Sequence, residues 1–128
     1  MKKIFIETYG CQMNVADSEL VAGIITDTNH QITDDINSAD VIIFNTCSVR
    51  QHAEDRVLGR IANESSRKKN KPELKIGVIG CMAQRLGETL LNNKAIDFVV
   101  GVDQYTALPD IIDNLDEHDH YFTEVDNS

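Results

Sequence analysis

Short apolar runs rich in β-branched residues alternate along the chain with segments whose apolar positions recur every three to four residues. Strands are predicted at residues 3–7, 30–33, 40–45, 74–79 and 96–100. Helices are predicted over residues 15–28, from Ser48 to a polar basic loop at 65–72, over 83–91 and over 107–115. In the second of these helices, a four-residue spacing predicts a buried ridge made of Val49, Ala53, Val57 and Ile61.

Strands that alternate with helices form right-handed βαβ units, which place the strands parallel in one sheet and the helices on its two faces. The predicted fold class is therefore α/β, with a small doubly wound, flavodoxin-like and mostly parallel five-stranded sheet of order 2-1-3-4-5. We expect one domain over residues 1–116. Residues 117–128 show no regular period, so we interpret them as an acidic tail or the start of a linker.

Each of the three cysteines follows a predicted strand and precedes a predicted helix. Cys11 follows the first strand, Cys47 the third and Cys81 the fourth, at spacings of 36 and 34 residues. In the predicted order these three strands are neighbours, and open α/β sheets bind ligands at the carboxyl ends of their strands. The helix N-termini that follow favour thiolate over thiol. We therefore expect the three cysteines to converge at one edge of the sheet.

Three thiolates at one edge suit a soft metal. A 4Fe-4S cluster normally takes four cysteines, so three would leave one iron open to a substrate. Zinc is an alternative metal, with His52 as the nearest candidate fourth ligand, although this histidine lies more than one turn into the predicted helix. Free cysteines are also among the residues most often buried in protein cores, so packing without a metal is a further alternative.

The net charge of the 128 residues is −9, and the acidic excess is confined to one end of the chain. Residues 1–94 contain 12 acidic and 12 basic side chains, whereas residues 95–128 contain nine acidic and no basic ones. The overall charge therefore does not exclude nucleic-acid binding by one face. The longest apolar runs are strand-sized, and residues 1–7 contain no long apolar segment, so we expect neither a membrane span nor a secretion signal. We expect a cytoplasmic monomer whose thiols stay reduced.

The segments around the cysteines are similar to those of a known enzyme family. They read Tyr9-Gly10-Cys11-Gln12-Met13-Asn14, Asn45-Thr46-Cys47-Ser48-Val49-Arg50 and Gly80-Cys81-Met82-Ala83-Gln84. Over residues 2–115 the chain resembles the amino-terminal domain of the radical-SAM methylthiotransferases. The first two motifs are most similar to the branch that adds a methylthio group to C2 of N6-isopentenyladenosine at position 37 of tRNA.

The resemblance implies that Cys11, Cys47 and Cys81 hold an auxiliary 4Fe-4S cluster, whose open iron holds the sulfur that is added to the adenine. It also implies a partner, because family members carry a second 4Fe-4S cluster in a radical-SAM domain that cleaves S-adenosylmethionine. The Cys-x3-Cys-x2-Cys spacing that binds this second cluster does not occur in the chain. We therefore expect the radical-SAM domain in cis in a longer chain or in trans, and we do not expect this chain alone to be catalytically competent.

Residues beside the cysteines are further candidates for the site. Candidates for lining the pocket are Gln12, Met13, Asn14 and Gln84. Packing explains these four equally well, and helix N-capping is the simpler role for Asn14. Candidates for contacting tRNA phosphates are Arg50, Arg56 and Arg60, with solvated helix positions as the alternative. For the whole chain, the alternative function is a non-catalytic α/β binding or signalling module whose cysteines are structural or bind zinc.

Overall fold

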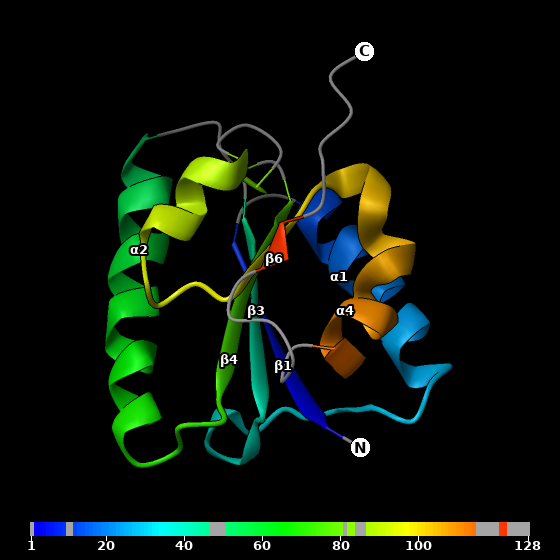
Figure 1. Ribbon diagram of the computed structural model, residues 1–128. Helices are drawn as coiled ribbons and strands as arrows, with labels where there is room; N and C mark the ends of the chain where they lie inside the picture. The colour runs from blue at the N-terminus through cyan, green and yellow to red at the C-terminus, as the bar shows by residue number, and fades with distance from the viewer. Residues whose placement is uncertain are drawn as a thin grey trace.

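A computed structural model gives the fold of the protein and describes residues 2–9, 12–46, 51–80, 82–83, 87–114 and 121–122. Within these residues, six parallel strands form one sheet in the order β2-β1-β3-β4-β5-β6 (Figure 1). The strands are β1 (Lys3–Thr8), β2 (Gln31–Ile32), β3 (Val41–Thr46), β4 (Lys75–Gly80), β5 (Phe98–Val100) and β6 (Tyr121–Phe122). The α/β class and the predicted order of the first five strands are confirmed.

Strand β6 lies in the segment that the sequence predicts to be a tail or linker. It pairs with β5 through Phe98↔Tyr121 and Val99↔Phe122. A strand of two residues is too short to produce an alternating pattern, which is why the sequence gives no sign of it. The domain boundary at residue 116 stays a prediction.

The described α-helices are α1 (Gln12–Thr26), α2 (Gln51–Ser65) and α4 (Leu108–Asn114), and residues 82–83 are also helical. The described 3-10 helices are η1 (Ile36–Ser38), η2 (Ser66–Lys69), η3 (Gly87–Asn92) and η4 (Val102–Ala107). The α-helix predicted over 83–91 is wrong in its second half, because Gly87 has a φ of 54° and an α-helix cannot continue through it. No helix in the described ranges is both long and apolar enough to cross a membrane.

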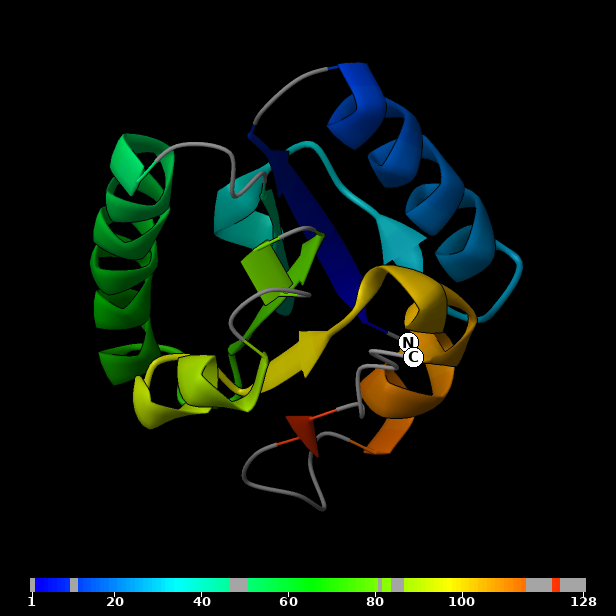
Figure 2. The same ribbon diagram turned by 90° about the horizontal axis from the view of Figure 1, so that it is seen from above.

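Two hydrophobic cores lie on opposite faces of the sheet, and β3 contributes to both. Val41 and Ile43 belong to the core under α1 and α4, whereas Ile42 and Phe44 belong to the core under α2. Figures 1 and 2 show α2 on one side of the sheet and α1 and α4 on the other. Every residue of β3 is buried, which explains why its first four residues, Val41 to Phe44, are a continuous apolar run instead of an alternation.

The predicted ridge of α2 is buried at the two positions whose side chains are described, Val57 and Ile61, both with 0% exposure. Val49 and the side chain of Ala53 lie outside the described part of the chain.

On β4, Gly77 is the register partner of Phe98 on β5, and a Cβ at Gly77 would overlap the Phe98 ring. The glycine therefore makes room for one of the largest buried side chains of the core.

We expect Gly77→Ala to lower the free energy of unfolding by about 1–3 kcal/mol, because the added methyl group overpacks the core against Phe98. Gly23→Ala in α1 is the matched control: apart from its two chain neighbours and the backbone of its own helix, no atom lies within 4 Å of the added Cβ. Alanine is favoured over glycine inside a helix by about 1 kcal/mol, so the control chain should be as stable as the parent or more so. Urea unfolding measures both variants. Equal stabilities for Gly77→Ala and the parent would contradict this packing.

Candidate functional site

The strand residues that lead to the three cysteines meet at one edge of the sheet. We call this the carboxyl edge and define it by Thr8, Thr46 and Gly80, the last residues of β1, β3 and β4. Thr8 pairs in register with Asn45, and Thr46 pairs with Gly80. The predicted neighbourhood of these three strands is therefore confirmed. Cys11, Cys47 and Cys81 themselves lie outside the described residues, so the convergence of their thiols stays a prediction.

A buried hydrogen-bond network lies at this edge. Asn45 has 0% exposure, and its Nδ2 donates to the main-chain oxygen of Asn14 and to Ser18 Oγ, both at 2.8 Å. Asn45 Oδ1 accepts from Asn14 Nδ2 at 3.2 Å. Ser18 Oγ lies 2.6 Å from Thr8 Oγ1, and the main-chain N–H of Tyr9 donates to the oxygen of Asn45 at 2.8 Å. The network joins the ends of β1 and β3 to the first two turns of α1.

The N-cap role expected for Asn14 is wrong. Helix α1 begins at Gln12, so Asn14 is the third residue of the helix instead of its cap. Its residue exposure is only 3%, and its side chain faces Asn45. The physical reason is that a buried partner amide across the helix–sheet interface satisfies the Asn14 side chain better than a helix end, since a buried polar group must be paired. Gln12 and Met13 lie in the same first turn, and Gln84 lies outside the described residues.

Gly80, which directly precedes Cys81, has a backbone conformation that favours glycine. Its φ is +94°. A Cβ at this position would lie 2.6 Å from Asn45 Oδ1 and 2.6 Å from the main-chain oxygen of Thr46. The absence of a side chain at Gly80 therefore lets β4 end directly against the Asn45 amide.

Ionic contacts connect the carboxyl edge to α2 on the other face of the sheet. Arg60 donates to Glu7 through Nε at 3.2 Å and through Nη2 at 3.0 Å, and the same Nη2 lies 3.0 Å from Glu64 Oε1. Tyr9 Oη donates to Glu7 as well. Partial burial and the hydrogen bond to Glu7 raise the pKa of the Tyr9 phenol above its ordinary value. The hydrogen bonds to Glu7 raise the pKa of Arg60, so both groups keep their protons at neutral pH.

The candidates for tRNA contact differ in their surroundings. Arg56 is exposed on α2, whereas Arg60 is held by two carboxylates, and Arg50 lies outside the described residues. A phosphate approaching Arg60 would compete with Glu7 and Glu64 for the same guanidinium. The tRNA contact stays a prediction, and Arg56 is the better placed of the two described arginines.

The described residues contain no group of three or more His, Cys, Asp or Glu side chains that could hold a metal ion. Any metal site at the carboxyl edge therefore depends on residues outside that set, and all three cysteines are outside it. The side chain of His52, the alternative zinc ligand, is also not described. Thiols are donors that suit a soft metal.

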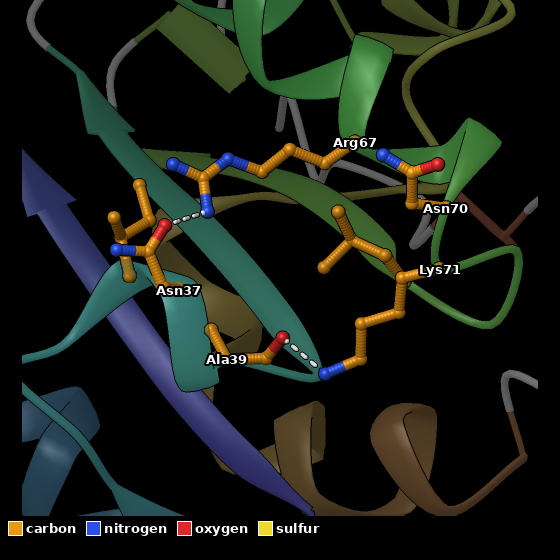
Figure 3. A pocket seen from close by; sticks show the side chains of 7 residues that line it. Asn37, Ala39, Arg67, Asn70 and Lys71 are labelled. Carbon is orange, nitrogen blue, oxygen red and sulfur yellow. Dashed lines mark hydrogen bonds between the residues drawn. The ribbon is translucent and has the colours of Figure 1, made fainter.

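Two hollows lie among the described residues at different ends of the sheet. One, of about 310 Å³, opens between α1 and β1 and includes Thr8, Ser18 and the half-exposed Val15, so it adjoins the carboxyl edge. The other, of about 190 Å³, lies at the amino ends of β3 and β4 and is shown in Figure 3.

The cations of the hollow in Figure 3 are already paired. Arg67 donates to Asn37 Oδ1 at 2.5 Å, and its Nε lies 2.6 Å from Glu64 Oε2. Lys71 Nζ donates to the main-chain oxygen of Ala39 at 2.9 Å and lies 2.9 Å from Asp40 Oδ1. Because each positive charge faces a carboxylate, this hollow is a structural junction between η2 and the start of β3, and it lacks the free charge of an anion site.

Sequence reasoning missed the network around Asn45, although one signal could have found it. Val41, Ile43 and Asn45 lie on the same face of β3, so the period of two that buries the first two residues also buries the third. A polar side chain at the buried face of an apolar strand requires a partner nearby. The Glu7–Arg60 contact had no comparable signal, because the two residues are 53 positions apart.

Comparisons with known proteins agree on one family. Residues 3–101 match the model of a family described as "Uncharacterized protein family UPF0004". The chain is 47% identical over 117 residues to a "tRNA-2-methylthio-N(6)-dimethylallyladenosine synthase" of Azobacteroides pseudotrichonymphae, covering 91% of the chain and 26% of the relative. Relatives of the same name match from Bacteroides thetaiotaomicron (47% identity, 87% of the chain, 24% of the relative) and Parabacteroides distasonis (50%, 87% and 24%). The chain therefore spans about a quarter of the length of these relatives.

The junction in Figure 3 has a predictable pH dependence, which Asp40 controls. Partial burial acts to raise the pKa of Asp40, but hydrogen bonds from the Lys3 N–H at 2.8 Å and from Lys71 outweigh it and hold the pKa below its ordinary value. The carboxylate therefore stabilises the fold above the unfolded-state pKa of about 4, and this stabilisation is lost as the pH falls through the lower folded-state pKa.

We expect Asp40→Asn to lower the free energy of unfolding at pH 7 by up to about 1 kcal/mol, since the contact is partly exposed. The difference from the parent chain should shrink as the pH is lowered from about 5 to about 2. Urea unfolding of both chains across this range measures the effect. A difference that is the same at every pH would contradict the assignment.

Proposed function

The chain belongs to the family described as Uncharacterized protein family UPF0004, and on that premise we propose that it is the auxiliary-cluster domain of a tRNA methylthiotransferase. In this proposal it binds a 4Fe-4S cluster through Cys11, Cys47 and Cys81 and donates sulfur to an adenosine of tRNA. The substrate is N6-isopentenyladenosine at position 37, modified at C2. The relatives that carry the name of such a synthase are about four times longer than the aligned region.

One observation carries the proposal: β1, β3 and β4 are adjacent and end together at the carboxyl edge. Cys47 and Cys81 each follow a residue of the register pair Thr46↔Gly80, and consecutive Cα atoms are only about 3.8 Å apart. Cys11 is preceded by Tyr9 and Gly10 and followed by Gln12, and both Tyr9 and the first turn of α1 contact the Asn45 segment. These short covalent connections support the proposal that all three thiols reach one small cofactor.

The described residues at the edge fit a cluster. The polar groups of Asn45 are already bonded to Asn14 and Ser18, so they do not compete with the cysteines as ligands. When bound, the three-cysteine cluster would supply an open iron that can carry the sulfur to be transferred. The start of α1, directly after Cys11, adds a positive helix dipole that favours the thiolate form.

The roles of the remaining residues follow from their positions. Gln12 and Met13, in the first turn of α1 next to Cys11, and Gln84, three residues after Cys81, are proposed to line the pocket that receives the base. Arg56 is proposed to contact tRNA phosphate. The radical-SAM domain, with its own 4Fe-4S cluster and S-adenosylmethionine, is proposed to act in cis in a longer chain or in trans, since the three cysteines of this chain are all assigned to the auxiliary cluster.

Iron and acid-labile sulfide per chain, measured after anaerobic reconstitution, test the cluster. We expect about four of each in the parent chain, since a 4Fe-4S cluster contains four irons and four sulfides. Cys11→Ala, Cys47→Ala and Cys81→Ala should each lose most of both. His52→Ala is the control that separates iron from zinc, and it should retain the full complement.

A single zinc per chain that depends on His52 would instead support the alternative of a zinc-binding module. A full iron and sulfide complement in any of the three cysteine variants would contradict the proposed ligand set.

The proposed tRNA contact predicts a charge-specific effect of Arg56. We expect Arg56→Ala to weaken binding of a tRNA transcript and to reduce the dependence of log affinity on log salt by about 1, as for one lost phosphate contact. Lys94→Ala is the matched control, because Lys94 is exposed and lies just before β5, at the opposite end of the sheet. Equal effects of the two substitutions would show that only overall charge matters.

A further inference from the structure

Asn45 contacts three segments of the chain, and each of these segments adjoins one of the three cysteines. Its own strand leads to Cys47 after one more residue. Its main-chain oxygen accepts from Tyr9, two residues before Cys11, and its side chain binds Asn14, three residues after Cys11. Its Oδ1 occupies the space that a Cβ of Gly80, directly before Cys81, would need. No other described side chain is placed against all three segments by the contacts given above.

Both polar atoms of this amide have hydrogen-bond partners. A primary amide has two N–H donors and a carbonyl oxygen that accepts. Both donors of Asn45 are taken, by Asn14 O and Ser18 Oγ, and the acceptor receives Asn14 Nδ2. Ser18 extends the contact to Thr8, the last residue of β1. Turning this buried amide over would exchange its oxygen with its nitrogen and break these three bonds, so the network favours one orientation and holds the bound segments relative to one another.

From this geometry we propose that Asn45 is a positioning residue that holds the three cysteine-bearing segments in the arrangement that binds metal, before any metal is present. The use of this arrangement for a 4Fe-4S cluster rests on the proposed function. The proposed positioning role itself needs only the contacts of Asn45 with Tyr9, Asn14 and Gly80. Groups that orient metal ligands typically change metal affinity by about 10- to 100-fold when they are removed. Preorganised ligands bind more tightly because less conformational entropy is lost on binding.

Cadmium is a suitable probe, because it binds thiolates and gives an ultraviolet charge-transfer band without requiring cluster assembly. We expect the metal-free parent chain to bind Cd²⁺ more tightly than Cys11→Ala, Cys47→Ala or Cys81→Ala. Asn45→Ala should lower the Cd²⁺ affinity by about 10-fold or more. Ser18→Ala removes only one partner of the amide and should lower the affinity by a few-fold, and this milder variant remains informative if Asn45→Ala folds poorly.

Thr46→Val is the matched control. Thr46 is as buried as Asn45 and adjacent to it, and its hydroxyl makes a long bond, 3.4 Å to the oxygen of Ile79. It should leave the Cd²⁺ affinity within about twofold of the parent. Urea unfolding of each variant gives its stability, so that affinities are compared among folded molecules. A purely structural Asn45 would lower the stability and leave the affinity of the folded chain unchanged.

The outcomes separate this proposal from the proposed function. Affinity that depends on Asn45, together with no iron and sulfide in the reconstituted parent, would support the positioning role and overturn the cluster. A full cluster in the parent, together with equal Cd²⁺ affinities in the parent and in the Asn45→Ala and Ser18→Ala chains, would overturn the positioning role and leave the cluster standing. A parent that binds Cd²⁺ no more tightly than the single cysteine variants would also overturn it.

Discussion

The parallel pairing of β1, β3 and β4 is the constraint on which the rest of the structure depends. Parallel strands run in one direction, so their carboxyl ends must lie at one edge, and every segment that leaves them starts there. Thr8, Thr46 and Gly80 are more than thirty positions apart in the sequence, and this pairing places them at one edge of the sheet. The buried amide of Asn45 then acts on segments that the sheet has already brought together.

Much of the fold could be predicted from the sequence, because it follows from hydrophobic patterns that extend over whole elements. The continuous apolar run of β3 indicates a strand buried on both faces, and the spacing of Val57 and Ile61 indicates the buried side of α2. Local features were harder. Asparagine is a residue type that is common at helix N-caps. The side chain of Asn14 instead contacts Asn45, and this tertiary contact explains why Asn14 lies inside the helix. The helix predicted over 83–91 does not continue through Gly87, because this glycine has a positive φ. The spacing of apolar residues carries no information about a single φ angle.

The location of the candidate site could be predicted from the sequence, but its hydrogen-bond network could not. The position of each cysteine after a strand indicates the edge at which the cysteines should meet, and the strand order agrees. The amide network at that edge depends on side chains from β1, β3 and α1 whose pairing has no periodic signal.

The distribution of charge along the sequence did not show which charged groups pair with one another. Residues 1–94 have equal numbers of acidic and basic groups, and contacts such as Arg60–Glu7 and Lys71–Asp40 pair some of these groups within the fold.

The central claim is that Cys11, Cys47 and Cys81 bind one cofactor at the carboxyl edge. The most direct test is a crystal structure of the anaerobically reconstituted chain, with anomalous difference density measured at the iron absorption edge. The account predicts one compact iron site beside Thr8, Thr46 and Gly80, bonded to the sulfur atoms of all three cysteines. Iron bound elsewhere, or a site that leaves one of the three sulfur atoms unbonded, would contradict it.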